Sequence, residues 1–142
     1  MLKIVRQLYE EIIAHCRREY PKEACGILAG PAAQGLPPLN QPRVVVASYP
    51  MRNVENSPIG YSMDPKEQLL IEKRMRVLGW HVIGIYHSHT ATDACPSPVD
   101  VRLAVSPDLS YVLVSLTDQQ QPVVKSYRID GTTVMPEAVT VG

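Results

Sequence analysis

The sequence predicts a mixed α/β fold built around one β-sheet. Segments whose apolar residues recur every three or four positions, as in helices, alternate with short apolar segments rich in β-branched residues. Their order along the chain is helix, strands, helix, strand, helix, strands. The chain has 142 residues, of which 45% are apolar and 20% charged, and both its size and its composition are ordinary for one globular domain, 1–142.

The N-terminal part of the chain predicts a helix followed by a buried strand. In residues 2–18 the apolar side chains fall at helical spacing, and Pro21 then ends the segment. His15 lies among the charged residues of this helix and is expected at the surface. The apolar run 24–29 is short and is bounded by Gly30 and a proline, which is typical of a buried strand.

The middle of the chain predicts a loop, a strand, a connection and a second helix. Four prolines and one glycine in 31–42 indicate a surface loop, and the β-branched run 43–49 indicates a strand. Residues 51–63 show no period and are expected to be a connection. Asp64, Pro65 and Glu67 form a capping-box pattern, so a helix should begin there and end near Leu78, before Gly79. The side chains expected to face the core from this helix are Leu70, Ile71, Met75 and Leu78.

The C-terminal part of the chain predicts one central strand, a short helix and further strands. The central strand is the apolar run 82–86, and the helix begins at Pro98 and ends before Pro107. Strands are expected at 111–116 and 123–129. The last run, 132–141, contains Pro136, so an edge strand is expected there.

Charge and hydropathy exclude several classes of function. The 14 basic and 14 acidic residues give zero net charge, so nothing indicates nonspecific binding to nucleic acid or to an anionic membrane. No apolar run is long enough to span a bilayer. The N-terminal residues carry charges where a signal peptide would be apolar. We therefore expect a cytoplasmic protein.

The three cysteines show no paired or metal-type spacing, and an odd number of free thiols fits the reducing cytoplasm. Cys25 and Cys95 lie close to chemically interesting residues and could be a metal ligand or a nucleophile. A structural thiol is the commoner case for a free cysteine.

One stretch carries the main chemical signal. His87 and His89 end the central strand with one residue between them, so their side chains point to the same face. Ser97 and Asp100 open the next helix as a capping box, and this helix start can bring Asp100 back toward the histidines. Two histidines and a carboxylate are sufficient protein ligands for a catalytic zinc. Taken singly, each of these residues could also be a surface histidine or a simple helix cap.

The spacing His87-Ser88-His89, seven residues, Ser97, two residues, Asp100 is similar to the signature of the JAMM metallopeptidases, also called MPN-plus domains. Their pattern also has an upstream glutamate in a Pro-x-Glu-x-Cys-Gly segment, and residues 21–30 of this chain read PKEACGILAG with Glu23 in that place. Small stand-alone prokaryotic members resemble this chain most in size. One difference is Thr90, where prokaryotic relatives usually have proline.

The resemblance implies a curved mixed sheet flanked by helices, akin to cytidine deaminases, and a zinc ion held by His87, His89 and Asp100. It assigns Glu23 as the general base and then acid, and Ser97 as the donor to the oxyanion. It also implies that an insertion near 51–63 can fold over the substrate as a flap.

The resemblance further implies the substrate. JAMM enzymes cleave amide or isopeptide bonds after the C-terminal Gly-Gly of ubiquitin-like proteins, and small prokaryotic members act on ubiquitin-like sulfur-carrier proteins. Two alternatives stay open. The chain could be a non-catalytic MPN-type interaction module, or a zinc peptidase of another specificity, such as cell-wall peptide processing. A deaminase is disfavoured because the Pro-Cys-x-x-Cys ligand pair is missing. The substrate-binding residues and the oligomeric state stay open.

Overall fold

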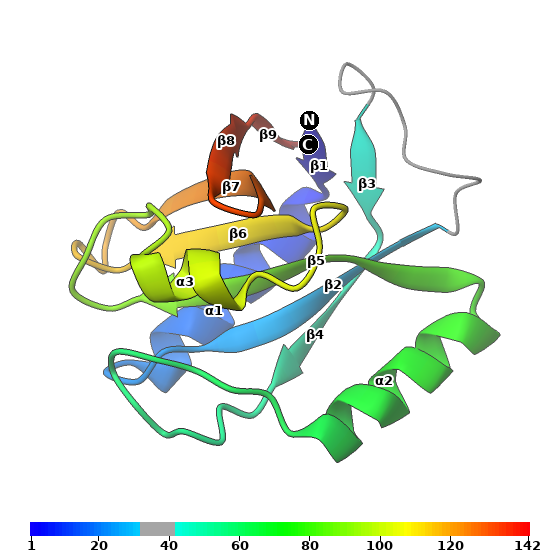
Figure 1. Cartoon of the computed structure of the whole chain (residues 1–142), viewed down its shortest axis with the longest axis horizontal. Coiled ribbons are helices and arrows are strands. Elements are labelled where there is room, and N and C mark those ends of the chain that lie inside the picture. The colour runs from blue at the N-terminus through cyan, green and yellow to red at the C-terminus, as the bar shows by residue number, and fades with distance from the viewer. Residues whose placement is uncertain (32–41) are drawn as a thin grey trace.

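A computed structural model describes residues 1–31 and 42–142, which form three helices and two β-sheets (Figure 1). The helices are α1 (Arg6–Glu19), α2 (Pro65–Val77) and α3 (Pro98–Leu103). The strands are β1 (Leu2–Ile4), β2 (Cys25–Pro31), β3 (Arg43–Val45), β4 (Ala47–Met51), β5 (Trp80–His89), β6 (Ser110–Ser115), β7 (Val123–Asp130), β8 (Thr133–Glu137) and β9 (Val139–Val141). No helix in the described part of the chain is long and apolar enough to cross a membrane.

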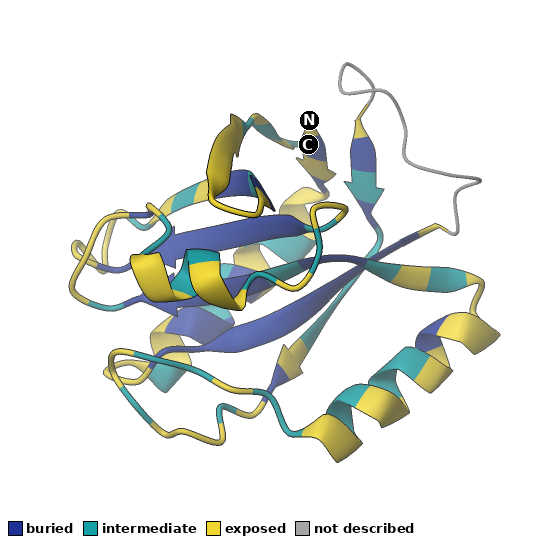
Figure 2. Ribbon diagram, viewed as in Figure 1, coloured by how far each residue is buried: buried dark blue, intermediate teal, exposed yellow. Residues whose placement is uncertain are grey.

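The main sheet has six strands in the order β4-β2-β5-β6-β7-β8. Its long strand β5 lies antiparallel to β2 and parallel to β6. The other sheet is small and parallel, with β1 between β3 and β9. The central strands β2 and β6 are almost entirely buried, whereas the edge strand β8 is mostly exposed (Figure 2). This burial explains why the β2 and β6 sequences are continuous apolar runs rather than alternating ones.

The two faces of the main sheet are covered differently. Helix α1 lies against one face, and α3 lies on the other (Figure 1). Tyr86 belongs to the α1 face, where it packs with Ile12 and Cys16. Because side chains alternate along β5, His87 and His89 lie on the opposite face, between α3 and the segment 51–63. Gly26 allows the close packing of the neighbouring strand: a Cβ there would lie 2.1 Å from the Tyr86 ring.

The first helix is shorter than its sequence pattern predicts. We expected a helix over 2–18, but Leu2–Ile4 is strand β1, and α1 begins only at Arg6. The apolar-polar-apolar order of Leu2, Lys3 and Ile4 fits a strand as well as a helix. Pairing with β3 and β9, which come from distant parts of the chain, decides between the two.

Two expected strands are each divided between the sheets. The run 43–49 forms β3 in the small sheet and then β4 at the edge of the main sheet. The run 132–141 likewise forms β8 in the main sheet and β9 in the small one. Both β8 and β9 are edge strands, as the proline in this run predicts. Of the expected loop 31–42, Pro31 ends β2, and residues 32–41 lie outside the described residues.

Helix α2 has the expected bounds but not the expected buried face. Asp64 caps it by accepting a hydrogen bond from the Lys66 backbone N–H at 2.8 Å, and Gly79 follows with φ +76°. Met75 is buried, but Leu70 and Leu78 are each 57% exposed, so their expected core positions are wrong. The reason is that, within the described residues, α2 packs mainly on β5 and β4 through one narrow stripe, so the rest of its surface is exposed (Figure 2).

The expected surface position of His15 is also wrong. His15 is only 4% exposed, and its Nδ1 lies 2.7 Å from the Tyr86 hydroxyl. Burial lowers the pKa of His15, although the nearby Glu19 opposes this effect. A neutral imidazole paired with a phenol satisfies both polar groups, which is why a histidine is tolerated inside this face.

Candidate metal centre and active site

The two histidines lie at the C-terminal end of β5, where the sheet meets α3. His87 is opposite Cys25 of β2 and Leu113 of β6, and His89 is opposite Ser115 of β6. Both imidazoles are buried. Their common face follows from the two-residue period of the strand, as the sequence predicted.

Asp100 reaches the histidines because Ser97 starts α3. The Ser97 hydroxyl accepts a hydrogen bond from the Asp100 backbone N–H, and Asp100 Oδ2 accepts one from the Ser97 backbone N–H at 2.9 Å. This capping box holds the carboxylate at the first turn of the helix. The structure therefore brings His87, His89 and Asp100 together.

The geometry of these three residues suits a tetrahedral metal ion. His87 Nε2 lies 3.2 Å from Asp100 Oδ1, His89 Nε2 lies 3.0 Å from Asp100 Oδ2, and the two Nε2 atoms are 3.2 Å apart. A tetrahedral zinc with bonds of about 2.05 Å requires ligand atoms ~3.3 Å apart. Within the described residues, these three are the group of histidine and acidic side chains that could hold a metal ion.

The motif loop, residues 90–96, connects His89 to Ser97, and its backbone carbonyls are hydrogen-bonded to side chains of the sheet. His89 Nδ1 lies 2.8 Å from the Asp93 carbonyl oxygen, which leaves Nε2 free to accept a metal. The hydroxyl of Ser115 donates to the Thr92 carbonyl, and the hydroxyl of Tyr127 donates to the Ala94 carbonyl. Strands β6 and β7 thus fix the loop that connects the histidines to Asp100.

Thr90 has its own role in this loop. Its hydroxyl donates to the Pro58 carbonyl at 3.0 Å and so connects the motif loop to the segment 51–63. A proline side chain could not make this bond. The difference from the usual prokaryotic motif therefore affects the loops beside the candidate metal centre, not the three candidate ligands.

The electrostatics of the group favour an ionised carboxylate between two imidazoles. Burial opposes the charge of Asp100, but hydrogen bonds from His87 and His89 outweigh it and hold the pKa of Asp100 well below its usual range. Burial lowers the pKa of His87 despite the carboxylate. For His89, burial also disfavours the charged form, but the Asp100 and Asp93 hydrogen bonds raise its pKa.

Glu23 lies beside this group. The Ser88 backbone N–H donates to the Ala24 carbonyl at 3.0 Å, so continuing the antiparallel register by one residue brings Glu23 opposite His89. Glu23 is 7% exposed and borders the same cavity as His89 and Ser97. Burial raises the pKa of Glu23 to about 7, with His89 opposing and Asp100 adding to the increase. A carboxylate that titrates near neutral pH can both take and return a proton.

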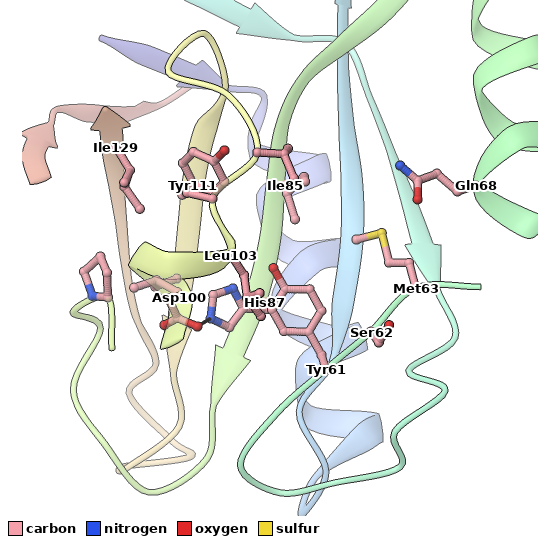
Figure 3. Close-up of a pocket in the computed structure, with 14 residues that line it drawn as sticks. Tyr61, Ser62, Met63, Gln68, Ile85, His87, Asp100, Leu103, Tyr111 and Ile129 are labelled. Carbon is pink, nitrogen blue, oxygen red and sulfur yellow. Dashed lines mark ion pairs between the residues drawn. The ribbon is translucent and has the colours of Figure 1, made fainter. Parts of the chain in front are cut away.

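Two cavities meet at the group of His87, His89 and Asp100. One, of about 260 Å³, includes His87, Ile85 and Tyr111 (Figure 3). The other, of about 370 Å³, includes Glu23, His89 and Ser97. Residues Tyr61, Asp100 and Leu103 border both cavities.

No individual role was expected for Tyr61 from the sequence. Its ring is stacked on the His87 imidazole, with centroids 4.6 Å apart and the planes inclined by 29° (Figure 3). The segment 51–63 contributes Tyr61 to both cavities beside the candidate metal centre. The flap that the resemblance implies near 51–63 indicated that this segment could lie near the site, but nothing in the residue spacing identified Tyr61.

The cysteines are not part of the candidate site. Cys25 is buried, and its thiol lies 3.9 Å from the Met51 carbonyl oxygen. Burial raises the pKa of Cys25 to about 12, which keeps the thiol protonated. Cys95 is exposed in the motif loop. Within the described residues, neither thiol belongs to the group that could hold a metal.

Comparison with known proteins identifies the class. Residues 5–130 match the family described as prokaryotic homologs of the JAB domain, and the chain belongs to this family. The resemblance to JAMM peptidases and the expected α/β fold are thereby confirmed.

The most informative relatives are peptidases. The chain is 43% identical to the CysO-cysteine peptidase of Mycobacterium tuberculosis over 141 residues, which cover 99% of this chain and 91% of the relative. It is 31% identical to the desampylase of Haloferax volcanii over 119 residues, or 80% of each protein. A solution structure of a Desulfitobacterium hafniense protein matches with a TM-score of 0.87 and 42% identity, covering 100% of this chain and 93% of that one. The chain is therefore a hydrolase of the peptidase kind.

Proposed function

We propose that the chain is a zinc metallopeptidase that cleaves the amide or isopeptide bond after the C-terminal Gly-Gly of a ubiquitin-like sulfur-carrier protein. The observation that carries the proposal is the convergence of three donor groups, 3.0–3.2 Å apart, beside the buried carboxyl of Glu23. In this proposal His87, His89 and Asp100 hold the zinc. When bound, zinc lowers the pKa of its water and polarises the substrate carbonyl.

Glu23 is proposed to move the proton. Its carboxylate receives the proton from the attacking water and then delivers it to the leaving amine. Two observations support this role: Glu23 shares a cavity with His89 and Asp100, and its pKa of about 7 makes both directions of transfer accessible near neutral pH.

Ser97 is proposed to donate to the oxyanion of the tetrahedral intermediate. Its oxygen already accepts the Asp100 backbone N–H, which fixes the side chain but leaves the hydroxyl proton available. Ser97 borders the cavity that also contains Glu23. A fixed donor costs no reorganisation during the reaction, which is the basis of oxyanion stabilisation.

The names of the relatives support the proposed substrate class. The Mycobacterium tuberculosis relative is named for a CysO-cysteine substrate, and the Haloferax volcanii relative is a desampylase. We propose a ubiquitin-like partner with an extended Gly-Gly tail, because a tail without side chains can lie in a narrow cleft as an added strand. We also propose that 1–142 acts as one domain in the cytoplasm. The pairing of β1 with β9 joins the two ends of this range.

The test uses a folded ubiquitin-like carrier whose Gly-Gly tail is extended by one cysteine or by a short peptide, and a free peptide with the same tail. The zinc-loaded chain should release the extension from the folded carrier much faster than from the peptide. A chelator and Glu23→Gln should each abolish the release. Equal cleavage of both substrates would indicate a general peptidase, and no cleavage of either would contradict the proposed substrate.

A further inference from the structure

The two histidines at the metal centre are held in different ways. His89 has the Asp93 carbonyl oxygen at its Nδ1. The polar side-chain contacts found for His87 among the described residues run through its Nε2, and the Tyr61 ring lies on the imidazole face, with centroids 4.6 Å apart. A histidine that ligates a metal needs a neighbour that fixes its ring, usually through the second nitrogen. At His87 the stacked Tyr61 ring is the neighbour that fixes the orientation of the imidazole.

The backbone that carries Tyr61 is itself fixed by one side chain. The Asn53 amide donates to the carbonyls of Gly60 and Glu23, each at 2.9 Å, and its oxygen accepts the Ser62 backbone N–H at 3.1 Å. The residues immediately before and after Tyr61 are therefore both bonded to Asn53. The same amide connects them to the backbone of the proposed general base.

The other end of Tyr61 reaches the space where a substrate can enter. The hydroxyl has no hydrogen-bond partner among the described residues, and Figure 3 shows it directed into the cavity of about 260 Å³. That cavity is bordered mostly by apolar side chains, such as Ile85, Leu103 and Ile129. Burial raises the pKa of Tyr61 well above its usual range, so the phenol stays a neutral donor.

We propose that Tyr61 is a positioning residue for His87 through its ring and a hydrogen-bond donor to the substrate backbone through its hydroxyl. A hydrogen-bond donor surrounded by apolar side chains suits a peptide carbonyl. Burying that carbonyl without a hydrogen bond would cost its full desolvation free energy. The role of the ring depends only on a metal ion being bound by His87 and not on which substrate is cleaved. The role of the hydroxyl rests on the proposed peptidase function.

The first experiment measures zinc affinity without substrate, by competition with a chelator, for the wild type, Tyr61→Phe, Tyr61→Leu and Tyr49→Leu. Tyr49 is the matched control because it packs in the same apolar cluster but borders neither cavity. Loss of the stack in Tyr61→Leu should weaken zinc binding about 10- to 100-fold. Tyr61→Phe and Tyr49→Leu should bind zinc as the wild type does.

Wild-type affinity in Tyr61→Leu, or equal losses in Tyr61→Leu and Tyr49→Leu, would overturn the role of the ring. Circular dichroism checks that each variant folds, and Tyr61→Met, which fills the space without a ring, replaces the leucine variant if that one fails to fold. A wild type that binds no zinc contradicts the proposed function itself, so the two failures are distinguishable.

The second experiment measures kinetics at saturating zinc with the folded Gly-Gly-tailed carrier. Tyr61→Phe should raise KM about two- to tenfold, with kcat little changed, because it removes one neutral hydrogen bond to the bound substrate. An unchanged KM would overturn the role of the hydroxyl. If the wild type binds zinc but does not cleave the carrier, the proposed substrate is wrong, while the result for the ring still stands.

Discussion

Replacing Glu23 by glutamine should abolish peptidase activity without changing zinc binding. Glu23 is not among the three groups that could hold the metal, so the variant should bind zinc as the wild type does. It should lose peptidase activity, because an amide cannot take up the proton of the attacking water. Appreciable turnover in the zinc-loaded variant would remove Glu23 from its proposed role.

The same substitution has a measurable effect on stability. Burial raises the pKa of Glu23 from 4.5 to about 7, so the folded state holds this proton more tightly than the unfolded chain does. The stabilisation is complete below pH 4.5 and is lost as the pH rises through 7. At about 1.4 kcal/mol per pKa unit, ionised Glu23 costs the folded, metal-free protein about 3 kcal/mol above pH 7.

Urea unfolding in the presence of a chelator measures this cost. Glutamine resembles the protonated acid, so Glu23→Gln should change the free energy of unfolding little at pH 4, below the unfolded-state pKa of 4.5. At pH 8 it should increase the free energy of unfolding by about 3 kcal/mol relative to the wild type. An increase of the same size at both pH values would refute the argument, since the effect would then be unrelated to ionisation.

Three further substitutions test the site and the fold. His89→Ala should lose the metal, and elemental analysis of protein prepared without a chelator should give near one zinc per wild-type chain and little in the variant; normal zinc content would remove His89 from the ligand set. Ser97→Ala should lower kcat about 10²–10³-fold, because it removes an oxyanion donor. It should also lower the free energy of unfolding by about 1 kcal/mol, because it removes a helix cap. A kcat equal to that of the wild type would contradict the catalytic role of Ser97. Gly26→Ala should destabilise the fold by about 1–3 kcal/mol, because the added Cβ lies 2.1 Å from the Tyr86 ring, whereas Gly142→Ala meets only the end of a lysine side chain and is the matched control; equal urea midpoints for these two variants would contradict the predicted clash.

The candidate site was predictable because its signals are local. His87 and His89 lie on one face through the strand period, and Ser97 with Asp100 forms a capping box that turns the carboxylate back. Glu23 was different: nothing near it in the sequence indicates a catalytic role, and only the resemblance assigned one. The antiparallel pairing of β2 with β5 is the physical reason that it lies beside the histidines.

The errors all concern long-range contacts. Leu2–Ile4 has a pattern that suits helix or strand, and its pairing with β3 and β9 decided for the strand. His15 lies among charged residues in the sequence, but the Tyr86 hydroxyl from β5 makes its burial possible. Leu70 and Leu78 are apolar at helical spacing, yet α2 has no partner on that side within the described residues.

The sequence by itself determined the α/β class, the bounds of helix α2, the start of helix α3 and the candidate ligands, because helix caps and strand periods act over a few residues. Only the tertiary structure decided that Glu23 adjoins His89, that two cavities meet at Asp100, and that Tyr61 stacks on His87. Those contacts join segments tens of residues apart. They exist because the sheet register and the Asn53 hydrogen bonds bring the segments together, and no local pattern in the chain encodes either.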